Sequence, residues 1–148
     1  QFFEWCDENM VHVQHIVFSA EEFQHFLNYR EQGVVPAGHR CVLFVLGRYN
    51  VNFQSEPADL DPFLQYDLAG LDWFTCAFGS LEQQCVMTAI NAGGHARIGF
   101  ENNLYLPNGE IAANTAALVS SLVDSMAAKN FLPASGSAAR QLLGVRKA

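Results

Sequence analysis

The sequence has few positive charges: eight lysine and arginine residues stand against fifteen aspartate and glutamate residues, and the formal net charge at pH 7 is −7. So acidic a chain repels the phosphates of nucleic acids and anionic lipid surfaces, and we expect neither as its main partner. The sequence also lacks an apolar run of about 18 residues and a signal-peptide pattern at its start. We therefore expect no membrane span and no secretion signal.

Three familiar motifs are missing as well, namely G-x-G-x-x-G, the Walker A motif and G-x-S-x-G. Their absence argues against a dinucleotide enzyme, an NTPase and an α/β-hydrolase. The four cysteines form no C-x-x-C pair, and none has zinc-knuckle spacing to a histidine. Cys41 and Cys76 lie inside apolar runs, where buried thiols are common. We expect the cysteines to be reduced and the protein to be cytoplasmic.

The sequence does contain enough apolar material for one domain, because half of its 148 residues are hydrophobic and no low-complexity linker interrupts residues 1–148. The chain opens directly in apolar residues, from Gln1 to Trp5, without an initiator methionine. We expect it to begin inside a longer protein, although a processed terminus would look the same. The basic pair Arg146-Lys147 is expected to be a solvated tail.

Short apolar runs alternate with helical patterns along the chain. The apolar runs predict strands over residues 11–18, 41–46, 73–78 and 95–100. The helical patterns predict helices over residues 19–32, from between 57 and 62 to 69, over 80–92, over 114–128 and over 138–143.

Capping residues support several of these helices. Ser19 with Glu22, and Ser80 with Gln83, match the capping-box pattern, and Asn114 is placed to cap the helix that follows it. Glycines that favour a helix end follow three of the helices: Gly33, Gly93-Gly94 and Gly144.

Successive strand-helix units are typical of a parallel α/β fold, in which right-handed crossovers place the strands side by side. Four such units could form a complete open sheet or half of an eight-unit barrel, and the pattern alone leaves both open. In either arrangement a functional site belongs at the carboxyl ends of the strands.

The predicted strand over residues 95–100 carries the chemistry. Alternation along a strand would place His95, Arg97 and Glu101 on one face, with apolar side chains on the other. Glu101 at the carboxyl end could be a general base, a metal ligand or the ion-pair partner of Arg97. A buried Arg97 needs an anion, which is either Glu101 or a substrate carboxylate. We expect His95 to be structural.

Other polar residues at the expected site edge carry weaker signals. Asn102 and Asn103 lie where the strand becomes a loop, and asparagine is common there for backbone reasons alone. His12 and His15 would lie on opposite faces of the first strand and so could not bind one metal together. Gly47-Arg48-Tyr49 and Gly79-Ser80 follow two strands, and the helix that begins after Ser80 could hold an anion such as a cofactor phosphate.

Residues 93–107, with Asn114 and residues 117–119, resemble the β-keto acid cleavage enzyme family. The block Gly93-Gly94-His95-Ala96-Arg97-Ile98-Gly99-Phe100-Glu101-Asn102-Asn103 is specific, and residues 44–47 and 142–144 support it. The resemblance is good over residues 40–144 and poor before them.

This resemblance implies a (β/α)8 TIM barrel that uses Zn²⁺ and acetyl-CoA in lysine fermentation. Such an enzyme would exchange acyl groups by retro-Claisen chemistry, turning a small β-keto acid and acetyl-CoA into an acyl-CoA and acetoacetate. Glu101 corresponds to a zinc ligand of the family, whose other ligands are a His-x-His pair. Arg97 corresponds to an arginine that, with a following acidic residue, positions or deprotonates the substrate. Here the following residue is Asn102, and an amide cannot act as a base.

The chain departs from the family in two further ways: it has no His-x-His, and the family's acidic motif is not recognisable around residues 11–15. With one zinc ligand in four, we expect the isolated chain to bind zinc poorly or not at all. Our leading interpretation is that the chain is the C-terminal half of such a barrel, with its last four β/α units. The alternative is a diverged fragment without activity that self-associates as a homo-oligomer or binds an N-terminal half-barrel.

Overall fold

The computed structural model describes residues 1–145, and the predicted tail of Arg146 and Lys147 lies outside them. Four parallel strands form one sheet in the order β1-β2-β3-β4, which confirms the predicted parallel α/β class. Their bounds are Gln14–Val17 for β1, Cys41–Leu46 for β2, Asp72–Ala77 for β3 and His95–Ala96 for β4. Within residues 1–145 the sheet stays open, so the fold is compatible with part of a barrel and does not close one.

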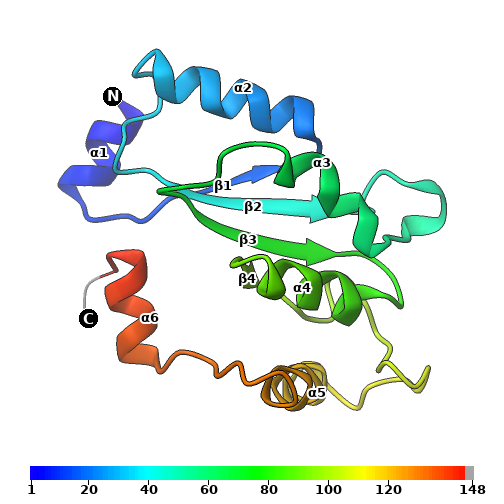
Figure 1. The fold of residues 1–148 in the computed structure, drawn as a ribbon. Coiled ribbons are helices and arrows are strands. Elements are labelled where there is room, and N and C mark those ends of the chain that lie inside the picture. The colour runs from blue at the N-terminus through cyan, green and yellow to red at the C-terminus, as the bar shows by residue number, and fades with distance from the viewer. Residues whose placement is uncertain (146–148) are drawn as a thin grey trace.

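Helices connect the strands, and α2, α3 and α4 pack against one face of the sheet (Figure 1). The α-helices are α1 (Phe2–Glu8), α2 (Ala20–Glu31), α3 (Asp61–Leu64), α4 (Glu82–Asn91), α5 (Thr115–Ala127) and α6 (Gly136–Leu143), and the 3-10 helices are η1 (Val51–Phe53) and η2 (Pro57–Leu60). Figure 1 shows α1 and α6 at the end of the sheet where the strands begin, and the loops after β2 and β4 at the opposite end.

Several strands and helices lie where local sequence patterns predicted them. All six residues of β2 are buried, as a strand covered on both faces requires. Ser19 caps α2 by accepting a hydrogen bond from the Glu22 backbone N–H at 3.1 Å. Asn114 caps α5 in the same way, with Oδ1 2.9 Å from the Ala117 nitrogen. These predictions are confirmed because they depend on contacts between near neighbours in the chain.

Three predicted elements described here were wrong in extent, and one helix was missed. The helix expected to reach residue 69 ends at Leu64, because the Asp67 side chain accepts a hydrogen bond from the Ala69 nitrogen at 2.9 Å and turns the chain. The first strand is four residues long rather than eight. Helix α6 begins two residues earlier than predicted, at Gly136. Helix α1 lies in a segment for which no helix or strand was predicted.

The capping box predicted at Ser80 and Gln83 is also absent. Helix α4 begins at Glu82 without a side-chain cap. The Ser80 backbone N–H donates to Gln54 Oε1 at 3.4 Å instead, and Gln83 Nε2 donates to Ser125 Oγ on α5 at 2.7 Å. Ser80 and Gln83, which the local pattern paired with each other, therefore both bond to residues distant in the sequence.

The largest core lies between the sheet and α2, α3 and α4. Parallel register places Val17, Phe44 and Thr75 on the same face of neighbouring strands, and the ring centroids of Phe44 and Phe63, on α3, lie 4.5 Å apart. Thirteen buried residues form this cluster, so most of the apolar burial of the chain is on the helix-covered face.

The opposite face of the sheet is less covered. Leu43, Val45 and Cys76 form a small buried cluster there, rimmed by partly buried phenylalanines. Ile16 on β1 belongs to the same face, because it is in register with Leu43, and it is 50% exposed. This open face lies on the inner side of any barrel built from the sheet.

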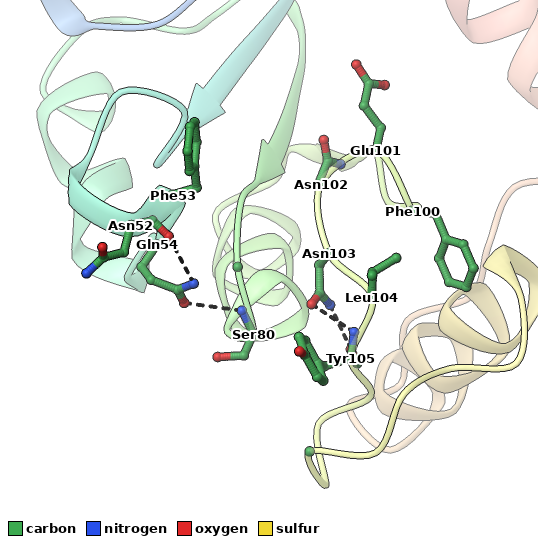
Figure 2. Close-up of a pocket in the computed structure, with 12 residues that line it drawn as sticks. Asn52, Phe53, Gln54, Ser80, Phe100, Glu101, Asn102, Asn103, Leu104 and Tyr105 are labelled. Atoms are coloured by element: carbon green, nitrogen blue, oxygen red, sulfur yellow. Dashed lines mark hydrogen bonds between the residues drawn. The ribbon is translucent and has the colours of Figure 1, made fainter.

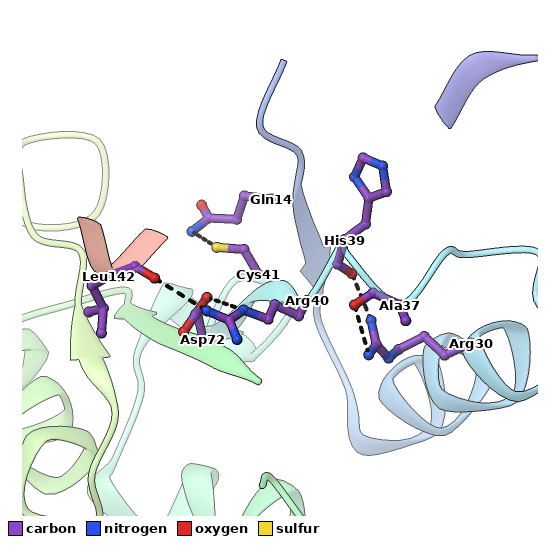
Figure 3. A network of polar contacts seen from close by, with 8 residues as sticks. All are labelled: Gln14, Arg30, Ala37, His39, Arg40, Cys41, Asp72 and Leu142. Atoms are coloured by element: carbon purple, nitrogen blue, oxygen red, sulfur yellow. Dashed lines mark hydrogen bonds and ion pairs between the residues drawn. The ribbon is translucent and has the colours of Figure 1, made fainter. Parts of the chain in front are cut away.

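A polar network ties the amino ends of the strands together (Figure 3). Arg40 Nε lies 2.9 Å from Asp72 Oδ2 at the start of β3, and Arg40 Nη2 donates to the Leu142 carbonyl oxygen of α6 at 3.3 Å. Arg30 Nη1 donates to the His39 carbonyl oxygen at 2.9 Å. These contacts hold α2 and α6 against the end of the sheet that is opposite to the expected site.

The cysteines and the helix lengths bear on two of the sequence predictions. All four cysteines are buried and free of disulfides, as expected for reduced thiols. No helix within residues 1–145 is both long and apolar enough to cross a membrane.

Candidate active site

The candidate site lies in the loop that follows β4, at the carboxyl ends of the strands. The expected strand over residues 95–100 is wrong in extent: β4 contains only His95 and Ala96. The Arg97 nitrogen still donates to the Thr75 oxygen at 2.9 Å, and the chain then turns, with the Asn102 nitrogen donating to the Gly99 oxygen at 2.9 Å. The alternating face predicted from the sequence is therefore replaced by a compact loop.

Arg97 and Glu101 meet across this turn. Arg97 Nη2 lies 2.6 Å from Glu101 Oε2, and the two side chains are 39% and 70% exposed. Figure 2 shows the Glu101 carboxylate pointing away from Asn103 and Tyr105. Of the alternatives left open by the sequence, the ion pair is the one present in this structure. An exposed pair such as this one contributes little stability, so it does not explain why the loop is ordered.

Asn102 and Asn103 point inward instead, to a carboxylate on α4. Glu82 Oε1 accepts hydrogen bonds from the Gly99 nitrogen at 3.2 Å and from Asn102 Nδ2 at 3.1 Å. Its other oxygen, Oε2, accepts from Asn103 Nδ2 at 3.3 Å. Glu82 is fully buried, and its burial raises the pKa of the carboxyl group, while the three donors oppose that rise.

Sequence reasoning missed Glu82, although a signal was present. Glu82, Cys85, Val86 and Ala89 recur at the spacing that places side chains on one helix face, and the other three are apolar. A carboxylate on such a face is buried and needs donors, which here come from the loop after β4.

Two cavities adjoin this loop. One, of about 470 Å³, lies beneath it and is lined by the loops after β2 and β3, including Gln54, Gly79 and Ser80 (Figure 2). The other, of about 320 Å³, opens on the less covered sheet face and is lined by Arg48, Arg97, Glu101 and Asn102 with apolar neighbours. The second cavity brings together Arg97, Glu101 and Asn102, the three residues to which the family resemblance gives a role in the site.

Arg48 is held at the rim of the second cavity by aromatic rings. Its guanidinium carbon lies 5.3 Å from the Phe78 ring centroid and 5.4 Å from that of Phe53. No carboxylate of residues 1–145 lies within ion-pair distance of it. Cys76 lines the same cavity, and burial raises the pKa of its thiol to about 11, so it is not a nucleophile there.

The anion site expected at the start of the helix after Ser80 is not available. The Ser80 nitrogen donates to Gln54, and the Gly79 nitrogen donates to the Asn102 oxygen at 3.1 Å. The Glu82 carboxylate already lies at this helix start. Two backbone donors beside this helix start are thus used within the chain, and the nearby carboxylate would repel a phosphate.

The histidines behave as structural residues. His95 lies 4.8 Å from the Phe74 ring centroid, as expected for a packed histidine. His15 lies between Phe3 and Phe26, at centroid distances of 5.8 and 4.8 Å. His12 precedes β1 and is exposed, so the two early histidines share no metal site.

Zinc does not fit the residues that this structure describes. Over residues 1–145, no three histidine, cysteine, aspartate or glutamate side chains come together in a metal-binding group. Glu101 is the ligand implied by the family resemblance, and its carboxylate is engaged by Arg97. A zinc site needs three or four protein ligands, so this donor set is insufficient.

Comparisons with known proteins place these residues in a family. A 3-keto-5-aminohexanoate cleavage enzyme of Fusobacterium nucleatum is 29% identical over 131 residues, which are 88% of this chain and 47% of that protein. An enzyme of the same name from Acetoanaerobium sticklandii is 36% identical over 107 residues, or 70% of this chain and 38% of that protein. The chain therefore spans less than half the length of these relatives.

The similarity also reaches further toward the N-terminus than the sequence motifs indicated. The model of the beta-keto acid cleavage enzyme family matches residues 1–145, so the poor resemblance expected before residue 40 was wrong. The first 40 residues supply β1 and α2, whose fold depends on packing rather than on a conspicuous motif. With its match over nearly its whole length, the chain belongs to the beta-keto acid cleavage enzyme family.

Proposed function

We propose that this chain supplies the C-terminal four β/α units of an enzyme that transfers an acyl group from a small β-keto acid to coenzyme A. Acetyl-CoA is the second substrate, and acetoacetate and an acyl-CoA are the products. The observation that carries the proposal is the cavity in which Arg48 and Arg97 meet Glu101 and Asn102 at the carboxyl ends of the strands. Barrel enzymes of this class place their active sites at that end.

The two arginines suit the carboxylate of a β-keto acid. Arg48 has aromatic contacts and no carboxylate partner within the described chain, so its guanidinium is free to bind an anion. Arg97 could exchange its exposed pairing with Glu101 for a charge-assisted bond to the substrate. Phe78 and Val45 form the apolar wall beside them, which would exclude water from the acyl chain.

The proposed site needs residues beyond those of this chain. In the family, zinc would polarise the substrate keto group, and Glu101 alone cannot hold that ion. Asn102 cannot be a base, and its amide is turned to Glu82. We therefore propose that the remaining ligands and the base belong to residues outside this sequence.

The less covered sheet face is where those residues would dock. Ile16 and the β4 edge are open, and a largely apolar cavity of about 780 Å³ lies along that edge between β4 and α5. The relatives are more than twice as long as the part this chain covers. We propose that four further β/α units occupy this face and pair with β1 and β4, which would close an eight-stranded barrel.

The test is to express the reading frame that contains this chain, together with its upstream coding sequence, and to measure acetoacetate formed from a β-keto acid and acetyl-CoA. We expect activity, a stoichiometric zinc ion and an upstream His-x-His pair. Arg48→Ala and Arg97→Ala should each raise the KM for the β-keto acid about tenfold. Arg140→Ala, on the exposed surface of α6, is the control and should change neither constant.

Three results would count against the proposal. They are an upstream frame that encodes no related sequence, no acetoacetate from the longest expressed protein, and equal kinetics for the arginine variants and the control. Light scattering of the 148-residue chain tests the alternative that a second copy of the chain covers the open face. In that case the 16.4 kDa chain would form a stable dimer.

A further inference from the structure

We propose that Glu82 is the positioning residue of the loop after β4, and that Glu82 and Asn102 act as one carboxylate–amide pair. In this pair, the negative charge that the family resemblance would place on residue 102 lies on residue 82 instead. The role of the loop in catalysis rests on the proposed function. The pairing of Glu82 with Asn102 rests only on contacts within the chain.

Glu82 holds the loop by three hydrogen bonds. Both the Gly99 backbone and the Asn102 amide donate to one carboxylate oxygen, at 3.2 and 3.1 Å, and Asn103 donates to the other at 3.3 Å. These donors lie 17 to 21 residues from Glu82 in the sequence. One side chain of α4 therefore fixes the start, middle and end of the turn that carries Glu101.

The carboxylate is costly where it lies, which argues that it does more than fill space. Glu82 is 0% exposed, and no cation of residues 1–145 forms an ion pair with it. The start of α4 and the three neutral donors are its only compensation. An apolar residue at position 82 would avoid this cost but would leave the loop donors without an acceptor.

Asn102 is matched to Glu82 by its chemistry. Its side chain is largely buried, and its Nδ2 donates to the carboxylate, so the pair contains one acceptor and one donor. An aspartate at position 102 would bring a second carboxylate to hydrogen-bond distance of the first. Like charges in such contact disfavour each other strongly, unless residue 82 becomes the amide.

The pair also sets the position of the candidate catalytic residues. Asn102 is joined to Glu82 by its side chain and to Gly79, in the loop after β3, by its carbonyl oxygen. Glu101 is its immediate neighbour, and Arg97 enters the same turn from β4. Loss of the pair would free the turn that brings Arg97 and Glu101 together.

Four proteins test the pair at a fixed pH of 8: the original chain, Asn102→Asp, Glu82→Gln and the double variant. Thermal unfolding of each 148-residue chain gives the coupling between the two positions. Asn102→Asp should lower Tm by about 5–10 °C, and the double variant should recover at least half of that loss, because it again has one carboxylate and one amide. If Asn102→Asp costs as much in the Glu82→Gln variant as in the original chain, the proposal is overturned.

The chain contains a matched control in Asn108 and Glu110. Asn108 Nδ2 donates to Glu110 Oε2 at 2.8 Å, and this carboxylate–amide pair is exposed. Asn108→Asp should therefore change Tm by less than about 1 °C, since solvent screens the new repulsion. A loss as large as that of Asn102→Asp would show that the effect comes from added charge anywhere in this acidic chain, and it would also overturn the proposal.

Two further measurements keep the test decisive. If Asn102→Asp fails to fold, the side-chain NH₂ resonances of Asn102 in the original chain should exchange slowly with solvent and shift in Glu82→Gln, and free exchange would refute the pair. In the longer enzyme, Asn102→Asp should lower kcat and the double variant should restore it, with the KM for acetyl-CoA unchanged. The stability cycle needs no activity, so it decides the pairing even if the proposed function fails.

Discussion

The two faces of the sheet differ in how completely they are covered. On the face toward α2, α3 and α4, thirteen buried residues form one cluster, and Phe44 contacts Phe23, Phe63 and Trp73. On the other face, among residues 1–145, the buried cluster consists of Leu43, Val45 and Cys76, and Ile16 at the edge is half exposed.

This difference separates the surface that stabilises the chain from the surface that the chain leaves open. The helix-covered face is complete by itself and supplies most of the hydrophobic stabilisation. The other face carries Arg48 and Arg97 at its carboxyl end and remains open, as expected for the inner face of a barrel segment. The buried carboxylate of Glu82 lies between the two, on a helix of the covered face but bonded to the loop of the open one.

The largest expected loss of stability comes from removing a buried side chain on the helix-covered face. Phe44→Ala should lower the free energy of unfolding by about 3–5 kcal/mol, because the side chain is fully buried among other rings. Ile16→Ala on the open face should cost less than about 1 kcal/mol. Urea unfolding of both variants checks the difference. Similar costs for the two would show that the open face is packed in solution.

A tight contact near β4 comes next in size. A methyl group at Gly94 would overlap the Trp73 ring of the covered face, so Gly94→Ala should cost about 1–3 kcal/mol. Gly38→Ala is the control, because no atom lies within 4 Å of the new methyl group and its backbone is not left-handed. Thermal unfolding measures both. A neutral Gly94→Ala would mean that Trp73 moves freely and that β4 is loosely held.

The pH dependence of stability should reveal the Glu82 carboxyl group. Burial raises its pKa in the folded chain, so the folded state binds this proton more tightly than the unfolded state does. The stabilisation associated with Glu82 is therefore fully present below its unfolded pKa and is lost as pH rises through its folded pKa. The free energy of unfolding of the original chain, relative to Glu82→Gln, should fall in urea titrations as the pH is raised from below the ordinary pKa of glutamate; a rise would contradict the assignment.

The smallest effect is expected from the exposed ion pair of the site. Arg97→Ala should change the free energy of unfolding by less than about 1 kcal/mol, because both partners are well exposed. Under the proposed function, the same substitution should weaken substrate binding. Chemical denaturation of the chain with and without 0.5 M salt measures the pair, and a large salt-sensitive loss would mean that Arg97 supports the fold.

Much of the fold could be predicted from the sequence because it depends on short-range signals. The buried run 41–46 formed β2 without change, and Ser19 and Asn114 capped the helices that follow them. The site was predicted only in part. Arg97 and Glu101 do lie together, but through a turn that the alternating pattern concealed, and the roles of Arg97, Glu101 and Asn102 in catalysis stay predictions.

The sequence by itself determined the order of the strands and α-helices from β1 onward, the free cysteines and the family, since these follow from periodicity, composition and one specific block of residues. Only the tertiary structure decided that β4 is short and that the loop after it bonds to Glu82. Glu82 and Asn102 are twenty residues apart in the chain, and their hydrogen bond exists because α4 packs beside β4. Local patterns do not record such contacts, because burial and the need for a donor arise only when distant segments come together.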